Sequence, residues 1–139
     1  MKFLNYTFFY TYIGLVLLAG FWGAFLYPSL DFSYLFKMEI NELPDFSKVN
    51  MLSQYRFLRA LELGYGLFAI VFFKEIFSFR KYNNLFLAIM GMGVLSRAVS
   101  WIIDGMPSPL FIFFLVYEAV GWIVIFLYSR KIGIHYVGR

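Results

Sequence analysis

The chain has 139 residues, of which 62% are hydrophobic and only 14% are charged, against roughly 45–50% and about 25% in ordinary soluble domains. This composition, with 19 phenylalanines and a mean hydropathy of +0.74, excludes a water-soluble globule and predicts a single transmembrane domain over residues 1–139. The absence of cysteine excludes disulfides and thiolate sites, and the net charge of +4 is small, with no basic surface of the kind that binds nucleic acid.

Residues 7–27 are predicted to form the first membrane-spanning helix. The stretch is apolar apart from hydroxyl groups, and about 20 helical residues cross a hydrocarbon core of about 30 Å. Bulky aromatic residues occupy the region where a signal-peptide cleavage site needs small ones, which favours a retained helix over a cleaved signal peptide. Gly20 and Ala24 form a small-xxx-small pair, so we expect another helix to approach closely there.

Residues 28–50 form the longest polar segment, which is acidic on balance and is predicted to be an outer loop. Its apolar and aromatic residues are too numerous for a free linker, so we expect a short amphipathic element that ends near Pro44. A solvated loop whose aromatic side chains touch the membrane surface fits the same residues equally well.

Three further helices are predicted over residues 51–77, 85–103 and 110–128, each with an apolar centre. Asn83 and Asn84 are expected to cap the helix that follows them, because asparagine is a favoured N-cap residue. With the first helix, these segments predict an all-α fold, an integral membrane four-helix bundle.

The turn between the last two predicted helices carries clear stop and start signals. Gly105 suits the left-handed conformation that often ends a helix, and Ser108 followed by Pro109 is typical of an N-cap and a first helical residue. The last two helices are therefore predicted to form a tight antiparallel hairpin.

The basic residues predict the orientation of the bundle. Seven lysines and arginines lie in the amino-terminal end, the connection 74–84 and the tail: Lys2, Lys74, Arg80, Lys81, Arg130, Lys131 and Arg139. Only Lys37 and Lys48 lie in the 28–50 loop. Because lysine and arginine prefer cytoplasmic loops, both termini are predicted to be cytoplasmic.

Among the ionisable residues of the predicted helices and their ends, five form a group toward the outer side: Arg59, Glu62, Arg97, Asp104 and Glu118. The rise of an α-helix places four of them ~10–16 Å below the outer helix ends, in one layer. An unpaired charge near the bilayer centre costs roughly 2.5–3.5 kcal/mol. The sequence therefore predicts a buried ion-pair network inside the bundle.

Two contacts are expected within this network. Arg97 should lie near Glu118, and Arg59 should lie near Glu62 or Asp104. Asp104 falls at the carboxyl end of its helix, where the helix dipole disfavours a negative charge, so we expect a cationic partner for it.

The leading functional hypothesis is a polar pocket in the outer half of the bundle that binds a lipid-like or amphipathic small molecule. Four aromatic residues are candidate pocket walls: Tyr65, Trp101, Tyr117 and Trp122. The alternatives are a non-catalytic structural or assembly subunit of a membrane complex and an isomerase-like membrane enzyme that uses buried carboxylates. An ion network that only fixes helix register explains the charges more simply than acid–base chemistry does.

The expected partners are the lipid bilayer, a lipid-like small molecule and a second copy or another membrane subunit. No cofactor and no metal are expected, because the single histidine, His135, lies in the tail and no metal-ligand spacing occurs.

Three short motifs resemble a known family. They are Arg59-Ala-Leu-Glu-Leu-Gly64, then Ser96-Arg97 with Trp101 and Asp104-Gly105, and then Tyr117-Glu118. The pattern resembles a four-helix bacterial inner-membrane family known only as a conserved domain of unknown function. The resemblance implies that the protein lies in a bacterial inner membrane. It also marks six signature positions: Arg59, Gly64, Arg97, Asp104, Gly105 and Glu118. The family pattern has no position that corresponds to Glu62, and the resemblance implies no catalytic reaction. More loosely, the architecture is similar to DoxX-like membrane proteins and to emopamil-binding-type sterol isomerases, which use acidic residues in a bundle pocket.

Overall fold

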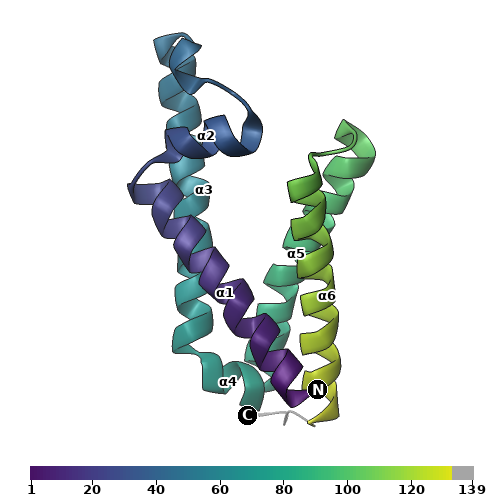
Figure 1. Cartoon of the computed structure of the whole chain (residues 1–139). Helices are drawn as coiled ribbons and strands as arrows, with labels where there is room; N and C mark the ends of the chain where they lie inside the picture. Colours follow the sequence, from purple (N-terminus) through teal and green to yellow (C-terminus); the bar gives the residue numbers. More distant parts are fainter. Residues whose placement is uncertain (133–139) are drawn as a thin grey trace. The chain divides into compact units, whose positions relative to one another are not determined.

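The structure is a computed structural model of the chain, and it describes residues 1–132. His135 and Arg139 of the basic tail lie outside the described residues. The described elements are all helices, in the order α1 (Lys2–Phe25), α2 (Pro28–Phe36), the 3₁₀ turn η1 (Ile40–Glu42), α3 (Asp45–Val71), α4 (Phe73–Ser78), α5 (Arg80–Asp104) and α6 (Pro109–Lys131) (Figure 1). The all-α prediction is confirmed.

Three of the described helices, α1, α5 and α6, are long and apolar enough to cross a membrane. They correspond to the predicted helices 7–27, 85–103 and 110–128, and each begins earlier than predicted. In α1 and α5, polar residues of the first turns lower the local hydropathy without interrupting the helix. Length and composition thus indicate a membrane protein.

The predicted helix 51–77 begins earlier in the structure, at Asp45, within the segment predicted to be a loop, and it differs in two further ways. It is divided into α3 and α4 by a turn at Phe72, where no proline or glycine gives a signal in the sequence. In addition, α3 is not among the helices apolar enough to span a membrane, because Arg56, Arg59 and Glu62 lie in its amino-terminal two thirds. The structure therefore supports three apolar helices of spanning length, where the sequence predicted four.

Several local predictions can be compared with the structure. The 28–50 loop contains a short helix, α2, which Lys37 ends in a left-handed conformation. Ser108 is the N-cap of α6, as predicted. Gly105 has a positive φ of 103°, as a glycine allows, but its ψ of −178° is extended, so the predicted left-handed helical conformation was wrong. The capping prediction for Asn83 and Asn84 was wrong: α5 begins at Arg80, so both asparagines lie inside the helix.

The chain divides into two compact units, and α1 contributes to both. Unit 1 consists of Met1–Tyr12 and the described part of Val71–Arg139, so it holds the start of α1 together with α4, α5 and α6. Its core is aromatic: the ring of Phe9 lies 5.2 Å from that of Phe73 and 5.3 Å from that of Phe86. In this unit α5 and α6 form the expected antiparallel hairpin (Figure 1).

The hairpin of unit 1 is held together by Trp122. Its indole Nε1 donates a hydrogen bond to the Leu87 carbonyl oxygen at 2.8 Å, which ties α6 to α5. A Cβ atom at Gly91 would lie 3.0 Å from that nitrogen, so the absence of a side chain there lets the indole reach the backbone.

Unit 2 comprises Ile13–Ile70, which holds the rest of α1 with α2, η1 and α3. Glycines bring α1 and α3 together: a Cβ atom at Gly20 would lie 2.7 Å from the Leu63 backbone nitrogen, and one at Gly66 would lie 2.7 Å from the Leu17 side chain. The predicted close approach at Gly20 is confirmed, and it places the charged face of α3 against the end of α1.

Candidate functional site

The first group of charged side chains lies in unit 1, between α5 and α6. Arg97 Nε donates to Glu118 Oε2 at 3.0 Å, and Arg97 Nη2 reaches Glu118 Oε1 at 3.4 Å. Both residues lie at a similar distance from the turn that joins the helices, so an antiparallel hairpin brings them level. The predicted contact between Arg97 and Glu118 is confirmed.

This ion pair is partly open. The Arg97 side chain is 35% exposed and that of Glu118 is 15% exposed. Two of the three guanidinium nitrogens of Arg97 face the carboxylate, and no described residue accepts a hydrogen bond from the third, Nη1. Next to Glu118, the Tyr117 hydroxyl forms a hydrogen bond with Thr11 of α1. Among the described residues, the Nη1 edge of Arg97 is therefore not engaged by the ion pair.

The second group lies in unit 2 and centres on Arg59. Its Nη1 donates to Glu62 Oε2 at 2.6 Å, and its Nε donates to the Tyr55 hydroxyl at 2.8 Å. The Tyr55 hydroxyl in turn donates to Asp31 Oδ2 at 2.7 Å, and Arg59 Nη2 lies 3.7 Å from the same oxygen. The predicted contact between Arg59 and Glu62 is confirmed, and Asp31 adds a second carboxylate near the guanidinium.

Local structure explains why these four side chains meet. Tyr55, Arg59 and Glu62 follow one another at intervals of four and three residues, so they share one face of α3. Asp31 comes from the first turn of α2, where a carboxylate is favoured by the helix dipole. Gly23 of α1 has no side chain, and a Cβ atom there would lie 2.6 Å from the Arg59 side chain.

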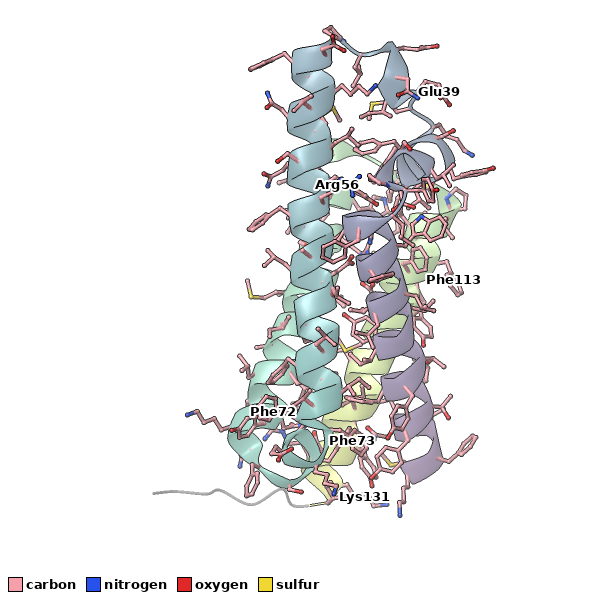
Figure 2. All side chains as sticks on the ribbon, turned by 90° about the vertical axis from the view of Figure 1, so that its left-hand side faces the viewer. Glu39, Arg56, Phe72, Phe73, Phe113 and Lys131 are labelled. Atoms are coloured by element: carbon pink, nitrogen blue, oxygen red, sulfur yellow. The ribbon has the colours of Figure 1, made fainter. Side chains whose placement is uncertain are left out.

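A third arginine anchors α3 to the end of α1 in unit 2. Arg56 Nη1 donates to the Ala24 carbonyl oxygen at 2.6 Å, and its side chain points from α3 toward α1 and α2 (Figure 2). Ala24 lies in the last turn of α1, whose carbonyl groups have no partner within the helix. Arg56 thus satisfies one of these carbonyls and holds the end of the helix.

The sequence of this chain matches one protein-family model. The family model described as "Domain of unknown function (DUF4345)" matches residues 2–129, which include both charged groups. The chain belongs to this DUF4345 family. No curated protein and no solved structure matches it.

Asp104 of this DUF4345 chain lies apart from the ion pairs. It is exposed at the end of α5, and its carboxylate accepts a hydrogen bond from Ser100 Oγ at 2.8 Å. Among the described residues no cation forms an ion pair with it, so the expected cationic partner was wrong. Exposure to solvent and the hydrogen bond from the Ser100 hydroxyl stabilise the Asp104 carboxylate without a counter-ion.

The four aromatic candidates of the DUF4345 chain have different surroundings. Trp122 packs the hairpin, and its ring is stacked at 5.3 Å on that of Phe126. Tyr117 is held by Thr11, whereas Trp101 is 40% exposed and Tyr65 is partly buried in α3. Their role as pocket walls stays a prediction.

The five charged candidates of the DUF4345 chain fall into separate groups. Arg97 and Glu118 pair within unit 1, and Arg59 and Glu62 pair within unit 2, so neither unit alone contains the predicted single network. The side chains are also more open than predicted, since that of Glu62 is 38% exposed. Among the described residues, no group of three or more histidine, cysteine, aspartate or glutamate side chains could hold a metal ion.

Sequence reasoning missed two members of the unit 2 group. Tyr55 carries a usable signal, because it lies four residues before Arg59 and therefore on the same helical face. Asp31 carries no such signal, because its contact depends on α2 folding back onto α3. Spacing along one helix is visible in a sequence, but the return of a separate element is not.

Proposed function

We propose that this membrane protein binds an amphipathic molecule whose headgroup presents phosphate or carboxylate oxygens, and that Arg97 receives the headgroup. The observation that carries this proposal is the free Nη1 edge of Arg97, which lies on a helix apolar enough to span a membrane. A charged side chain at such a position is costly, so it is more readily explained by a ligand that uses it than by helix packing alone.

The chemistry of the pair supports this role. A guanidinium has five N–H donors, and those that do not face Glu118 remain available to a second pair of oxygens. Glu118 holds the guanidinium in a fixed orientation, which reduces the entropy lost when a ligand binds. The hydroxyl groups of Tyr117 and Thr11 would border the headgroup, while the apolar surfaces of α5 and α6 would contact its acyl chain.

The proposed setting is the inner membrane of a bacterium, with both termini in the cytoplasm. The distribution of lysine and arginine supports this orientation. We further propose that the apolar second half of α3 serves, with α4, as a fourth membrane-crossing segment of a single domain. In this arrangement the headgroup site of Arg97 lies in the outer half of the membrane, and it is filled from the outer leaflet.

A structural or assembly role is the second candidate, and the unit 2 group favours it. Arg59 is engaged by Tyr55, Glu62 and Asp31 at once, as expected of an arginine that fixes the packing of three helices. Isomerase-like chemistry of the emopamil-binding type has less support. Glu62 and Glu118 each already form an ion pair with an arginine, which a substrate would have to displace.

Native mass spectrometry of the purified protein, with identification of the released lipids, tests the proposal. Wild type should carry a lipid with a phosphate or carboxylate headgroup, and Arg97→Gln should lower the lipid-bound fraction about tenfold, the cost of roughly one charge-assisted hydrogen bond. Arg130→Gln is the matched control, because Arg130 is an exposed arginine near the end of α6. Equal lipid occupancy in wild type and Arg97→Gln, both folded by circular dichroism, would exclude the proposed site.

A further inference from the structure

Two asparagines are buried in unit 1 with polar atoms that have no partner. Asn5 of α1 is fully buried, and Asn83 of α5 is 1% exposed. Both Nδ2 and Oδ1 of Asn5, and Nδ2 of Asn83, have no hydrogen-bond partner among the described residues. Buried amides are nearly always hydrogen-bonded, because an unpaired polar group in an apolar environment destabilises the fold. The unpaired atoms of these two amides therefore indicate a bound molecule that forms hydrogen bonds with them.

The helical register places the two amides opposite one another. Phe9 and Phe86 are in contact, with ring centroids 5.3 Å apart. Asn5 precedes Phe9 by four residues and Asn83 precedes Phe86 by three, so each asparagine shares the face of its phenylalanine, about one turn nearer the start of its helix. Within unit 1, α1 and α5 start at the same end and run in the same direction (Figure 1). This register predicts that the two amides lie at a similar level, on the sides of α1 and α5 that face each other.

The unpaired amide atoms do not form a hydrogen bond with each other, although both lie in the same buried core. The facing amides offer N–H donors from both residues and an accepting oxygen from Asn5. A group that fits between them must both accept and donate hydrogen bonds, and it must be small and preferably neutral, because the surrounding core is aromatic.

We propose that Asn5 and Asn83 form a binding site for a hydroxyl group, supplied either by the alcohol headgroup of an amphiphile or by a water molecule. The site is independent of the proposed function at Arg97. Asn83 and Arg97 are 14 residues apart on α5, which corresponds to roughly 21 Å along the helix axis. A hydroxyl accepts from the two amide N–H groups and donates to the free carbonyl oxygen, so one ligand satisfies the three unpaired atoms.

Thermal unfolding of the full chain, in a detergent without hydroxyl groups, tests the amphiphile as the source. We expect 1-decanol at a hundredfold excess over its Kd to raise the Tm of wild type by more than about 4 °C. The matched ether 1-methoxydecane accepts hydrogen bonds but cannot donate one, so it should produce no shift. Asn5→Leu and Asn83→Leu should abolish the 1-decanol shift, and Asn84→Leu should retain it, because Asn84 is exposed beside the buried residue.

Nuclear magnetic resonance of the ¹⁵N-labelled wild type tests water as the source and does not depend on any variant folding. If 1-decanol gives no shift, persistent nuclear Overhauser effects from the Asn5 and Asn83 side-chain amides to water would support the site with water as its ligand. If neither amide shows a contact with decanol or with long-lived water, the proposal is overturned.

Discussion

The ion pair between Arg97 and Glu118 yields a quantitative prediction about stability. Arg97→Gln leaves the Glu118 carboxylate without its cation, and Glu118→Gln leaves the guanidinium without its anion. The double variant replaces both charges by neutral amides, so neither side chain leaves an unpaired charge. The loss in the double variant should therefore be smaller than the sum of the two single losses.

The expected magnitude follows from the exposure of the two side chains. Breaking a buried ion pair costs about 3–5 kcal/mol, whereas an exposed pair contributes about 0.2–1 kcal/mol. Glu118 is 15% exposed and Arg97 is 35% exposed, so this pair lies between the two limits. We expect about 2 kcal/mol for each single variant and about 2 kcal/mol for the double variant, which gives a coupling energy of about 2 kcal/mol.

Equilibrium unfolding in mixed micelles, with a rising mole fraction of sodium dodecyl sulfate, measures these free energies. Circular dichroism measures the loss of the helices. Ser100 and Asp104 provide the control, because this pair is exposed and should show a coupling energy below about 0.5 kcal/mol. Strictly additive losses at Arg97 and Glu118 would show that the observed contact contributes nothing to stability.

Three further predictions use the same unfolding measurement. Gly20→Ala should destabilise the protein by about 1–3 kcal/mol, because the new methyl group would lie 2.7 Å from the α3 backbone, whereas Gly14→Ala, with open space around it, should not destabilise it. Tyr55→Phe should cost about 1–2 kcal/mol, because it removes the hydroxyl that joins α2 to the arginine of α3. Trp122→Phe should cost about 1 kcal/mol through loss of the bond to the α5 carbonyl.

Each of these predictions can fail in a recognisable way. Equal stability of the two glycine variants would mean that α1 and α3 are not in close contact at Gly20. A Tyr55→Phe variant as stable as wild type would show that α2 is held by its apolar contacts alone. Retention of full stability in Trp122→Phe would mean that the α5 carbonyl finds another donor.

The sequence predicted contacts within a hairpin better than contacts between separate elements. Arg97 and Glu118 could be paired in advance because a short turn fixes the register of the two helices, and Arg59 and Glu62 because their spacing fixes a common face. Asp31 could not be placed, since its contact with Tyr55 requires α2 to return onto α3. The break at Phe72 was also invisible, because the apolar pattern continues through it.

By itself the sequence determined the helical class, the three apolar segments long enough to span a membrane, and the local register that pairs charges along one helix or across one tight turn. These features depend on hydropathy and on the 3.6-residue period, which any short stretch of chain carries. Only the tertiary structure decided that two units each hold their own charged group, that Asp104 stays exposed, and that Asn5 and Asn83 are buried without partners. Burial and non-local contact are set by which faces meet, and that choice is made by the packing of the whole chain.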